Sequence, residues 1–427
     1  MIPFSEANSV LCALLIVLVP LAPVGLAFLN TGLTRSRSAA QCLLGGLCLM
    51  AVAAVAYFAV GYCWQGFAGA PSHTVQAGGA SWDWIATRAP FFRHLSWTGA
   101  PETYAAVFQL VIVGMVALIP WGSGAERWRL GAAALATVAL AGFVFPIFAH
   151  WAWASGWLAQ LGTSFHLGSG FIDPGGAATI QAIGGLSALA AVWILGPRRG
   201  KFPPNSPPAA LPAHHIVYAL FGSAVAFIGW LALNALGAIL FAGAPLGRIP
   251  LVELNTILCA SGALLAALVV TRIRFGKPDA SLCVNGWTAG LVASSAVAAV
   301  LSPGGALFTG VIAGAFLPIC IEFAESRCGI DDPSGGITVH GLAAIWGLFA
   351  AGLLTHGTGG QLLAQLVGIA TLLGLMLPGI YVLFWIFNSI LPFRTSAEGE
   401  RIGMDLHELG AGAYPEFVLH SDEFLPR

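Results

Sequence analysis

The sequence predicts an all-α integral membrane protein with eleven transmembrane helices, its N-terminus outside the cell and its C-terminus in the cytoplasm. Of the 427 residues, 58% are hydrophobic and only 8% are charged, and the mean hydropathy is +0.85. A water-soluble domain of this length does not need so apolar a composition. The chain also divides into apolar stretches of membrane-spanning length, and its basic residues favour one side of the resulting topology.

Each predicted span contains about 20 largely apolar residues and ends where Arg, Lys, Pro or Gly cluster. The first span follows Glu6 and precedes Arg35 and Arg37, a charge order typical of a retained helix rather than of a signal peptide. In chain order, the predicted spans are 8–30, 41–65, 103–122, 131–151, 174–196, 215–241, 250–271, 283–301, 305–324, 333–355 and 362–389.

The basic residues predict the orientation of these spans. Fourteen of the seventeen Lys and Arg residues fall on the side of the C-terminus, whereas Arg88, Arg93 and Arg248 fall on the other side. The positive-inside rule therefore places the C-terminal side in the cytoplasm and the loop 66–102 outside. We expect a multi-pass protein of the inner (plasma) membrane, in direct contact with the lipid bilayer.

The chain is expected to have one membrane domain, residues 1–391, followed by a cytoplasmic tail, residues 392–427. A proline-rich linker, PPNSPPAALPAHH, divides the membrane domain into halves of about 8–200 and 214–356. The last span, 362–389, lies outside this division.

Composition and motifs exclude several classes of function. The formal net charge of −1 does not point to nucleic acid as a partner. The eight cysteines lie mostly in apolar stretches without a C-x-x-C pair, so we interpret them as buried apolar side chains rather than metal ligands. Because no P-loop, H-E-x-x-H or G-x-S-x-G motif is present, we expect neither an enzyme nor a metal or other cofactor.

A short motif occurs twice in the chain. Residues 172–181 read IDPGGAATIQ and residues 331–340 read DDPSGGITVH. Asp is a good N-cap and Pro fits the first turn of a helix, so each copy predicts a helix start at Asp-Pro. The predicted topology makes the two helices antiparallel, as expected for an inverted repeat of helices 1–5 and 6–10.

The two copies end in Gln181 and His340, each eight residues after its Asp. At 1.5 Å per residue, each lies ~12 Å into a hydrocarbon layer ~30 Å thick, so both fall within roughly 6 Å of one level. A single polar side chain in a membrane helix often only joins helices. Two at matching positions favour a solute pathway near the midplane, where inverted-repeat transporters bind substrate.

Several stretches, in order along the chain, resemble the Amt/Mep/Rh family of ammonium transporters. They include GLAFLNTGLTRSRSA (25–39), GAERWR (124–129), GFIDPGGAATIQAIGGLSAL (170–189), GWLALNALG (229–237), GKPDASLCVNGWTAGLVA (276–293), DDPSGGITVHGLAAIWGL (331–348) and GMDLHELGAGAY (403–414). The resemblance implies a homotrimer with one narrow pore in each subunit, which carries ammonium or ammonia. It also implies a cytoplasmic tail that responds to PII-type regulators.

The resemblance assigns site residues by position. His340 matches the second of two mid-pore histidines, whereas Gln181 replaces the first. Phe108 and Trp153 match members of an outer cation-recruiting site whose serine is replaced by Gly237. The gate phenylalanines correspond to Ile112 and Leu233, Asp173 to a structural acid, and Asn234 to an asparagine of the sixth helix.

These departures leave three functions open. A Gln amide can donate and accept hydrogen bonds but does not titrate, so the pair cannot relay a proton between two imidazoles. The first hypothesis is transport of ammonium or ammonia with Gln181 and His340 at mid-pore. The alternatives are a non-conducting sensor or structural partner, and a channel for another small neutral solute.

Overall fold

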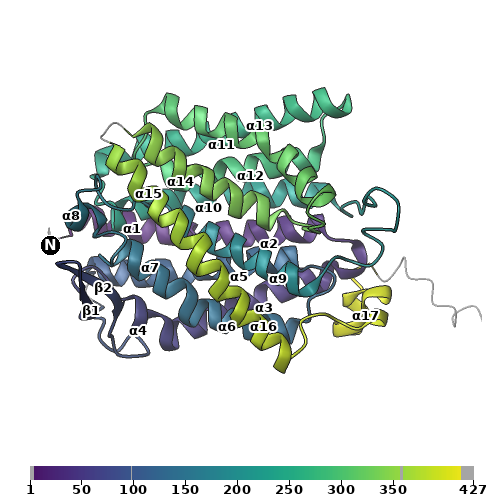
Figure 1. Cartoon of the computed structure of the whole chain (residues 1–427), viewed down its shortest axis with the longest axis horizontal. Helices are drawn as coiled ribbons and strands as arrows, with labels where there is room; N and C mark the ends of the chain where they lie inside the picture. Colours follow the sequence, from purple (N-terminus) through teal and green to yellow (C-terminus); the bar gives the residue numbers. More distant parts are fainter. Residues whose placement is uncertain (1–3, 98, 356–358, 415–427) are drawn as a thin grey trace, which may run out of the picture.

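The computed structural model describes residues 4–97, 99–355 and 359–414. Within them lie eleven helical segments long and apolar enough to cross a membrane, so the predicted fold class and number of spans are confirmed. The helices run roughly along the longest axis of the molecule (Figure 1). The symbol α denotes an α-helix, and η denotes a short segment of 3₁₀-helix or π-helix, called a 3₁₀ turn or a π turn below.

The first five spans fill the first half of the chain. Several of these spans contain a π turn. The short element η1 (Ser36–Ser38) lies between the first two spans, and α8 (Leu161–Phe165) lies between the fourth and the fifth. Their elements are α1 (Glu6–Leu18) with α2 (Leu21–Leu33); α3 (Ala39–Ala56), η2 (Tyr57–Gly61) and α4 (Tyr62–Gln65); α5 (Pro101–Ser123); α6 (Leu130–Ala139), η3 (Leu140–Val144) and α7 (Phe145–Trp153); and η4 (Ala177–Ala182) with α9 (Ile183–Leu195).

The remaining six spans follow the proline-rich linker. Their elements are α10 (Ile216–Phe241); η5 (Leu246–Arg248) with α11 (Ile249–Phe275); α12 (Ala280–Val297); α13 (Pro303–Ser326); η6 (Gly336–Leu342) with α14 (Ala343–Leu354); and α15 (Gly359–Thr371), η7 (Leu372–Met376) and α16 (Leu377–Ile390). The first spans of the two halves meet where α2 packs along α10, and the fifth meets the tenth where α9 packs on η6.

The loop 66–102 contains an antiparallel hairpin that the sequence analysis did not predict. Its strands are β1 (Ser72–Ala77) and β2 (Ala80–Ala86). The hairpin is held against the membrane helices by Asp83 of β2, whose carboxylate lies 3.0 Å from Nε2 of the buried His150 in α7. We call this end of the molecule the hairpin end (Figure 1).

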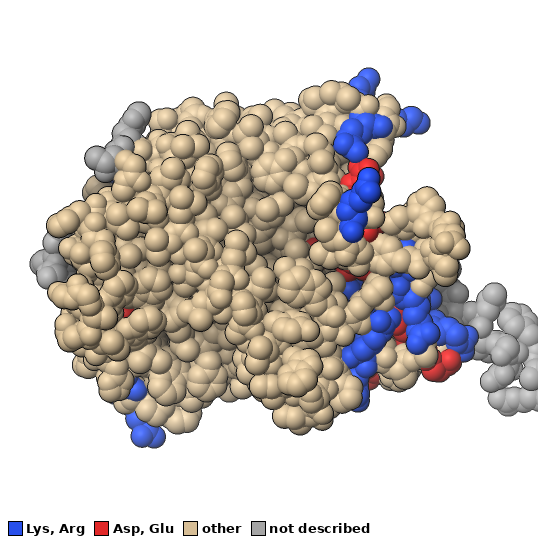
Figure 2. All heavy atoms as spheres, in the orientation of Figure 1, with Lys and Arg blue, Asp and Glu red and all other residues tan. Residues whose placement is uncertain are grey.

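The opposite end carries most of the charge. Figure 2 shows Lys and Arg gathered mainly there, with a smaller group at the hairpin end. We call it the basic end, and the positive-inside rule places it in the cytoplasm. At its centre Arg198 forms two hydrogen bonds with the carboxylate of Asp331, at 2.8 and 2.9 Å, and a third with Glu126 at 2.6 Å.

The described part of the tail forms α17 (Ala397–Ile402) and η8 (Asp405–Leu409) and packs on the chain's own membrane helices. Asp405 accepts a hydrogen bond from the backbone amide of Gln41 at 2.7 Å, and Glu408 accepts one from the backbone amide of Leu130 at 3.0 Å. These carboxylates cap the first turns of α3 and α6, where unpaired amides favour negative charge. Residues 415–427 of the predicted tail lie outside the described residues.

The interpretation of all cysteines as buried was partly wrong. Cys12, Cys42, Cys259 and Cys283 are buried, but Cys328 is exposed in the loop after α13. It lies at the basic end, where the apolar stretch has already ended, so no membrane or protein core covers it.

Candidate functional site

The two Asp-Pro motifs form matching turns before η4 and η6, but the helices begin later than predicted. The Asp173 carboxylate accepts from the amides of Ala178 and Thr179 at 3.0 and 2.8 Å and from the Thr179 hydroxyl at 2.7 Å. It therefore caps the helix from a distance, across Gly176 in the left-handed conformation (φ +79°). Pro174 lies in the turn outside the helix, so the expectation that it occupies the first helical turn was wrong.

The second copy has the same construction. The Asp332 carboxylate accepts from the amides of Gly336 and Ile337 at 3.0 and 2.8 Å and from the Ser123 hydroxyl at 2.7 Å. Gly335 supplies the left-handed residue, with φ +75°, and Pro333 again lies before the helix. Burial raises the pKa of both Asp173 and Asp332, although the hydrogen bonds that each carboxylate accepts oppose this shift.

Gln181 and His340 meet in the interior, as the matched depths predicted. Nδ1 of His340 lies 2.7 Å from Oε1 of Gln181, and the two residues are 2% and 0% exposed. Since an amide oxygen only accepts, Nδ1 carries the proton and Nε2 of the neutral ring keeps a lone pair. Nε2 of Gln181 has no partner among the described residues. The pair thus combines an unused amide donor with an imidazole acceptor.

Both residues of the pair lie on π turns, and their helices pass very close to each other. Gln181 belongs to η4 and His340 to η6. A Cβ added to Gly185 would lie 2.3 Å from the amide nitrogen of Gly341, so the crossing requires a residue without a side chain there. π turns often occur at functional sites.

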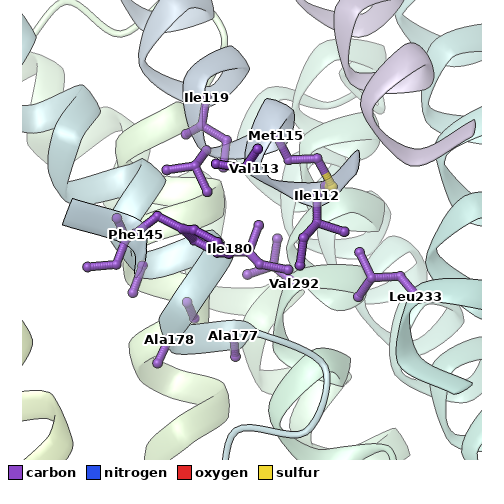
Figure 3. Packing of buried hydrophobic residues seen from close by; sticks show 14 of the residues in the cluster. Ile112, Val113, Met115, Ile119, Phe145, Ala177, Ala178, Ile180, Leu233 and Val292 are labelled. Carbon is purple, nitrogen blue, oxygen red and sulfur yellow. The ribbon is translucent and has the colours of Figure 1, made fainter. Parts of the chain in front are cut away.

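An apolar layer lies between the Gln181–His340 pair and the hairpin end. Ile112 of α5 and Leu233 of α10 lie in the same buried cluster as Ile180 and Val292 (Figure 3). Ile112, Leu233 and Gln181 are each 0% exposed. In this conformation no water-sized passage touches these three side chains, so a solute can pass them only if they move.

An aromatic group lies on the hairpin side of this layer. Trp153 stacks on Phe241 with ring centroids 4.2 Å apart and an interplanar angle of 2°, and Phe108 lies 6.0 Å from Phe241. The Trp153 indole N–H donates to the carbonyl oxygen of Asp173 at 2.6 Å. The structure therefore brings Phe108 and Trp153 together around a third ring.

The sequence analysis missed Phe241. Helical spacing contained the signal, because Phe241 follows Leu233 and Gly237 by eight and four residues and so shares their face of α10. Two nearby positions of α10, Gly237 and Asn234, have structural roles. Gly237 lies against the turn before η4, since an added Cβ would approach the Pro174 carbonyl oxygen to 2.1 Å.

Asn234 joins three helices. Its Nδ2 donates to the hydroxyl oxygens of Thr256 in α11 and Ser294 in α12, both at 2.9 Å. Such hydrogen bonds fix the relative positions of helices within a membrane. Asn234 therefore holds the wall that carries Leu233, as a structural residue beside the candidate pathway.

The paired motifs, the buried Gln–His contact and the eleven spans agree with a match to the Ammonium Transporter Family over residues 9–414. The chain belongs to this family. The ammonium transporter Amt2 of Archaeoglobus fulgidus is 32% identical over 452 aligned residues, which cover 99% of this chain and 90% of that protein.

Among solved structures, two similar ones illustrate how widely this fold of the Ammonium Transporter Family is used. The "Sensor Amt Protein" superposes with a TM-score of 0.84 at 26% identity, covering 94% of this chain and 98% of that one. Mep2 of Saccharomyces cerevisiae superposes with a TM-score of 0.78 at 24% identity, covering 93% and 89%.

Proposed function

We propose that the protein transports ammonium or ammonia through a pathway within its own chain, with Gln181 and His340 at the narrowest polar point. The observation that carries this proposal is the buried 2.7 Å hydrogen bond between the two side chains. It leaves an amide donor and an imidazole acceptor free, and ammonia can accept from the first and donate to the second. Family membership supports ammonia as the solute that uses them.

The pathway carries neutral ammonia rather than net charge past the pair. The pair offers no route for a proton, because Gln181 has no titratable group that can exchange a proton with Nε2 of His340. The outer group of Phe108, Trp153 and Phe241 attracts the cation to the entrance by cation–π contact, worth about 0.5–2 kcal/mol. The ion releases its proton to water at this entrance, before the apolar layer, because a charge costs far more to bury than neutral ammonia does.

The second candidate function is that of a non-conducting ammonium sensor. Its support is the closed layer, where Ile112, Leu233 and Gln181 have no exposed surface. A chain that binds the cation at the aromatic group, without a passage beyond it, would report ammonium by a change of conformation. One of the similar solved structures bears the name "Sensor Amt Protein".

We further propose that the chain works as a homotrimer in which each subunit has its own pathway, and that the tail at the basic end responds to a PII-type regulator. Asp405 and Glu408 support the second proposal, since their caps on α3 and α6 would couple a displaced tail to two membrane helices. Native mass spectrometry of the protein in detergent measures the mass of the intact complex and therefore tests the trimer.

Transport by the purified protein in liposomes tests the function. An ammonium pulse is applied while the current and the internal pH are recorded together. Alkalinisation without current is the expected result, because entering ammonia takes up protons inside. Current with little alkalinisation would contradict the neutral pathway. Silence in both recordings, from protein shown to be folded, would favour the sensor.

A further inference from the structure

A small cavity lies at the basic end, beside the start of η6. Its volume is about 20 Å³, and it is lined by Ile321, Ala324, Glu325, Ile330, Asp332, Ile337 and Thr338. A cavity of this size holds one molecule of the size of water. An ammonium ion has nearly the same size as water. Thr338 precedes His340 by two residues on η6, so the cavity lies on the basic side of the Gln181–His340 pair.

Thr338, one of the lining residues, has a polar side-chain atom without a partner in the described part of the chain. Thr338 is 6% exposed, and its Oγ1 makes no hydrogen bond with any described residue. A buried hydroxyl without a partner costs free energy, so its presence indicates a molecule that completes its hydrogen bonds. Ile321, Ala324, Ile330 and Ile337 offer it no polar side-chain group, and neither Glu325 nor Asp332 is hydrogen-bonded to it.

The charges around the cavity favour a cation. Asp332 accepts hydrogen bonds from three neutral donors, and no basic side chain pairs with it among the described residues. Glu325 shares its charge with Lys201, whose Nζ lies 2.6 Å from Oε1. The carboxylates of Asp332 and Glu325 and the charged amino group of Lys201 together have a net charge of −1.

The other charged side chains nearby lie outside the lining of the cavity. Asp331, next in sequence to Asp332, is already paired with Arg198 and Arg127. Glu322, one helical turn before Glu325, pairs with Arg274 on the surface. Asp331 therefore has two basic partners and its group is not neutral, but neither this group nor Glu322 lines the cavity, where the charged side chains are those of Glu325 and Asp332.

We infer that this cavity binds one ammonium ion on the basic side of the pathway, with Glu325 as its charge partner and the Thr338 hydroxyl oxygen as a further acceptor. The inference rests on the proposed function, since it identifies where a transported molecule is held after it leaves His340. Ammonia that passes the neutral centre regains a proton from water, and the cation then stays beside the carboxylate. The aromatic group and the carboxylate cavity thus give the two ends of the pathway different chemistry.

Thallous ion, which resembles ammonium in size and charge, is a direct probe. Crystals of the full-length protein are soaked in thallium(I) nitrate, and anomalous difference density is measured. We expect a peak in contact with Glu325 and Thr338 that excess ammonium nitrate removes and sodium nitrate does not. If no anomalous peak appeared in the cavity, and its ordinary electron density were the same in sodium nitrate alone, the cavity would hold an ordered water and the inference would be wrong.

Variants test the roles of the side chains through the ammonium concentration that gives half-maximal thermal stabilisation. Loss of a charge-assisted hydrogen bond in Glu325→Gln should raise this concentration about tenfold. Lys201→Met should lower it, because the carboxylate loses its competing partner. Glu322→Gln is the matched control on α13 and should change nothing. If Glu325→Gln fails to fold, Thr338→Val tests the site with a smaller change in the same direction.

These results can be separated from the liposome experiment. Flux without thallium density in the cavity would overturn this site and leave the proposed transport standing. Thallium density in a protein that carries no flux would support the site and contradict the transport. If the ammonium concentration that gives half-maximal thermal stabilisation were the same for the wild type, Glu325→Gln and Lys201→Met, the inference would also be overturned.

Discussion

Gly237 of α10 lies directly against the carbonyl oxygen of Pro174, which an added Cβ would approach to 2.1 Å. This carbonyl belongs to the turn in which Asp173 caps η4, so the turn cannot retreat without disturbing the helix that carries Gln181. The hydroxyl that the family resemblance implies at this position is therefore absent because the packing has no room for it. The packing of this turn thus accounts for Gly237 in place of the serine that the resemblance implies.

Gly237→Ser should consequently destabilise the protein instead of restoring an ammonium contact. Overpacking at a buried backbone contact costs about 1–3 kcal/mol, and a fall in the melting temperature in detergent measures it. Gly131→Ala is the control, because an added Cβ meets nothing within 4 Å at that position of α6. A Gly237→Ser variant as stable as the wild type would show that the turn has another conformation.

Gln181→His should introduce or increase current during an ammonium pulse in liposomes. A second imidazole beside His340 can accept and return a proton, which the Gln amide cannot do. The current per folded protein is compared with that of Gln181→Asn, which keeps the amide chemistry. If Gln181→His leaves the current at the wild-type level, proton relay at this pair is not what limits charge movement.

His340→Ala should abolish selectivity for ammonium over other small solutes. It removes the acceptor at Nε2 and leaves Oε1 of Gln181 without its 2.7 Å partner. Competition by methylammonium during ammonium uptake measures the effect. Unchanged uptake and competition would remove His340 from the pathway. His340→Gln offers a polar replacement and should keep part of the selectivity.

Much of the fold was predictable because hydrocarbon imposes strict requirements on a spanning segment. The contact between Gln181 and His340 also followed from sequence, since both lie eight residues after an Asp on antiparallel helices. The helix starts did not follow, because a carboxylate that caps across a glycine turn leaves the same sequence pattern as an ordinary N-cap. Phe241 was missed because the resemblance drew attention to single positions of α10 and not to its whole face.

Phe241→Ala should weaken recruitment of the cation without closing the pathway. The ring stacks on Trp153 at 4.2 Å and completes the aromatic group with Phe108. Loss of one cation–π partner, worth about 0.5–2 kcal/mol, should raise the half-saturating ammonium concentration about twofold to thirtyfold. Phe221→Ala is the control, since Phe221 is an exposed ring on the same helix. Equal shifts in both variants would indicate a general effect of changes to α10.

Acid stability at the basic end depends on Asp331. Burial alone would raise the pKa of Asp331, but the hydrogen bonds and charge of Arg198 and the charge of Arg127 outweigh it and lower the pKa to about 2. A depressed carboxyl pKa stabilises the fold above its ordinary value of 3.8, and this contribution disappears as the pH falls toward about 2. The wild type should therefore lose stability over this interval.

Asp331→Asn should lose this stabilisation at neutral pH and show a flatter profile in acid. The substitution leaves Arg198 with Glu126 as its remaining carboxylate partner and Arg127 without the charge of Asp331, and breaking a buried ion pair costs about 3–5 kcal/mol. Melting temperatures between neutral pH and the onset of acid unfolding measure both effects. Glu398→Gln is the control, because Glu398 pairs with Arg401 on the exposed surface of α17 and should behave as the wild type. If Asp331→Asn and the wild type lost stability in parallel through the acid range, other carboxylates would control acid unfolding.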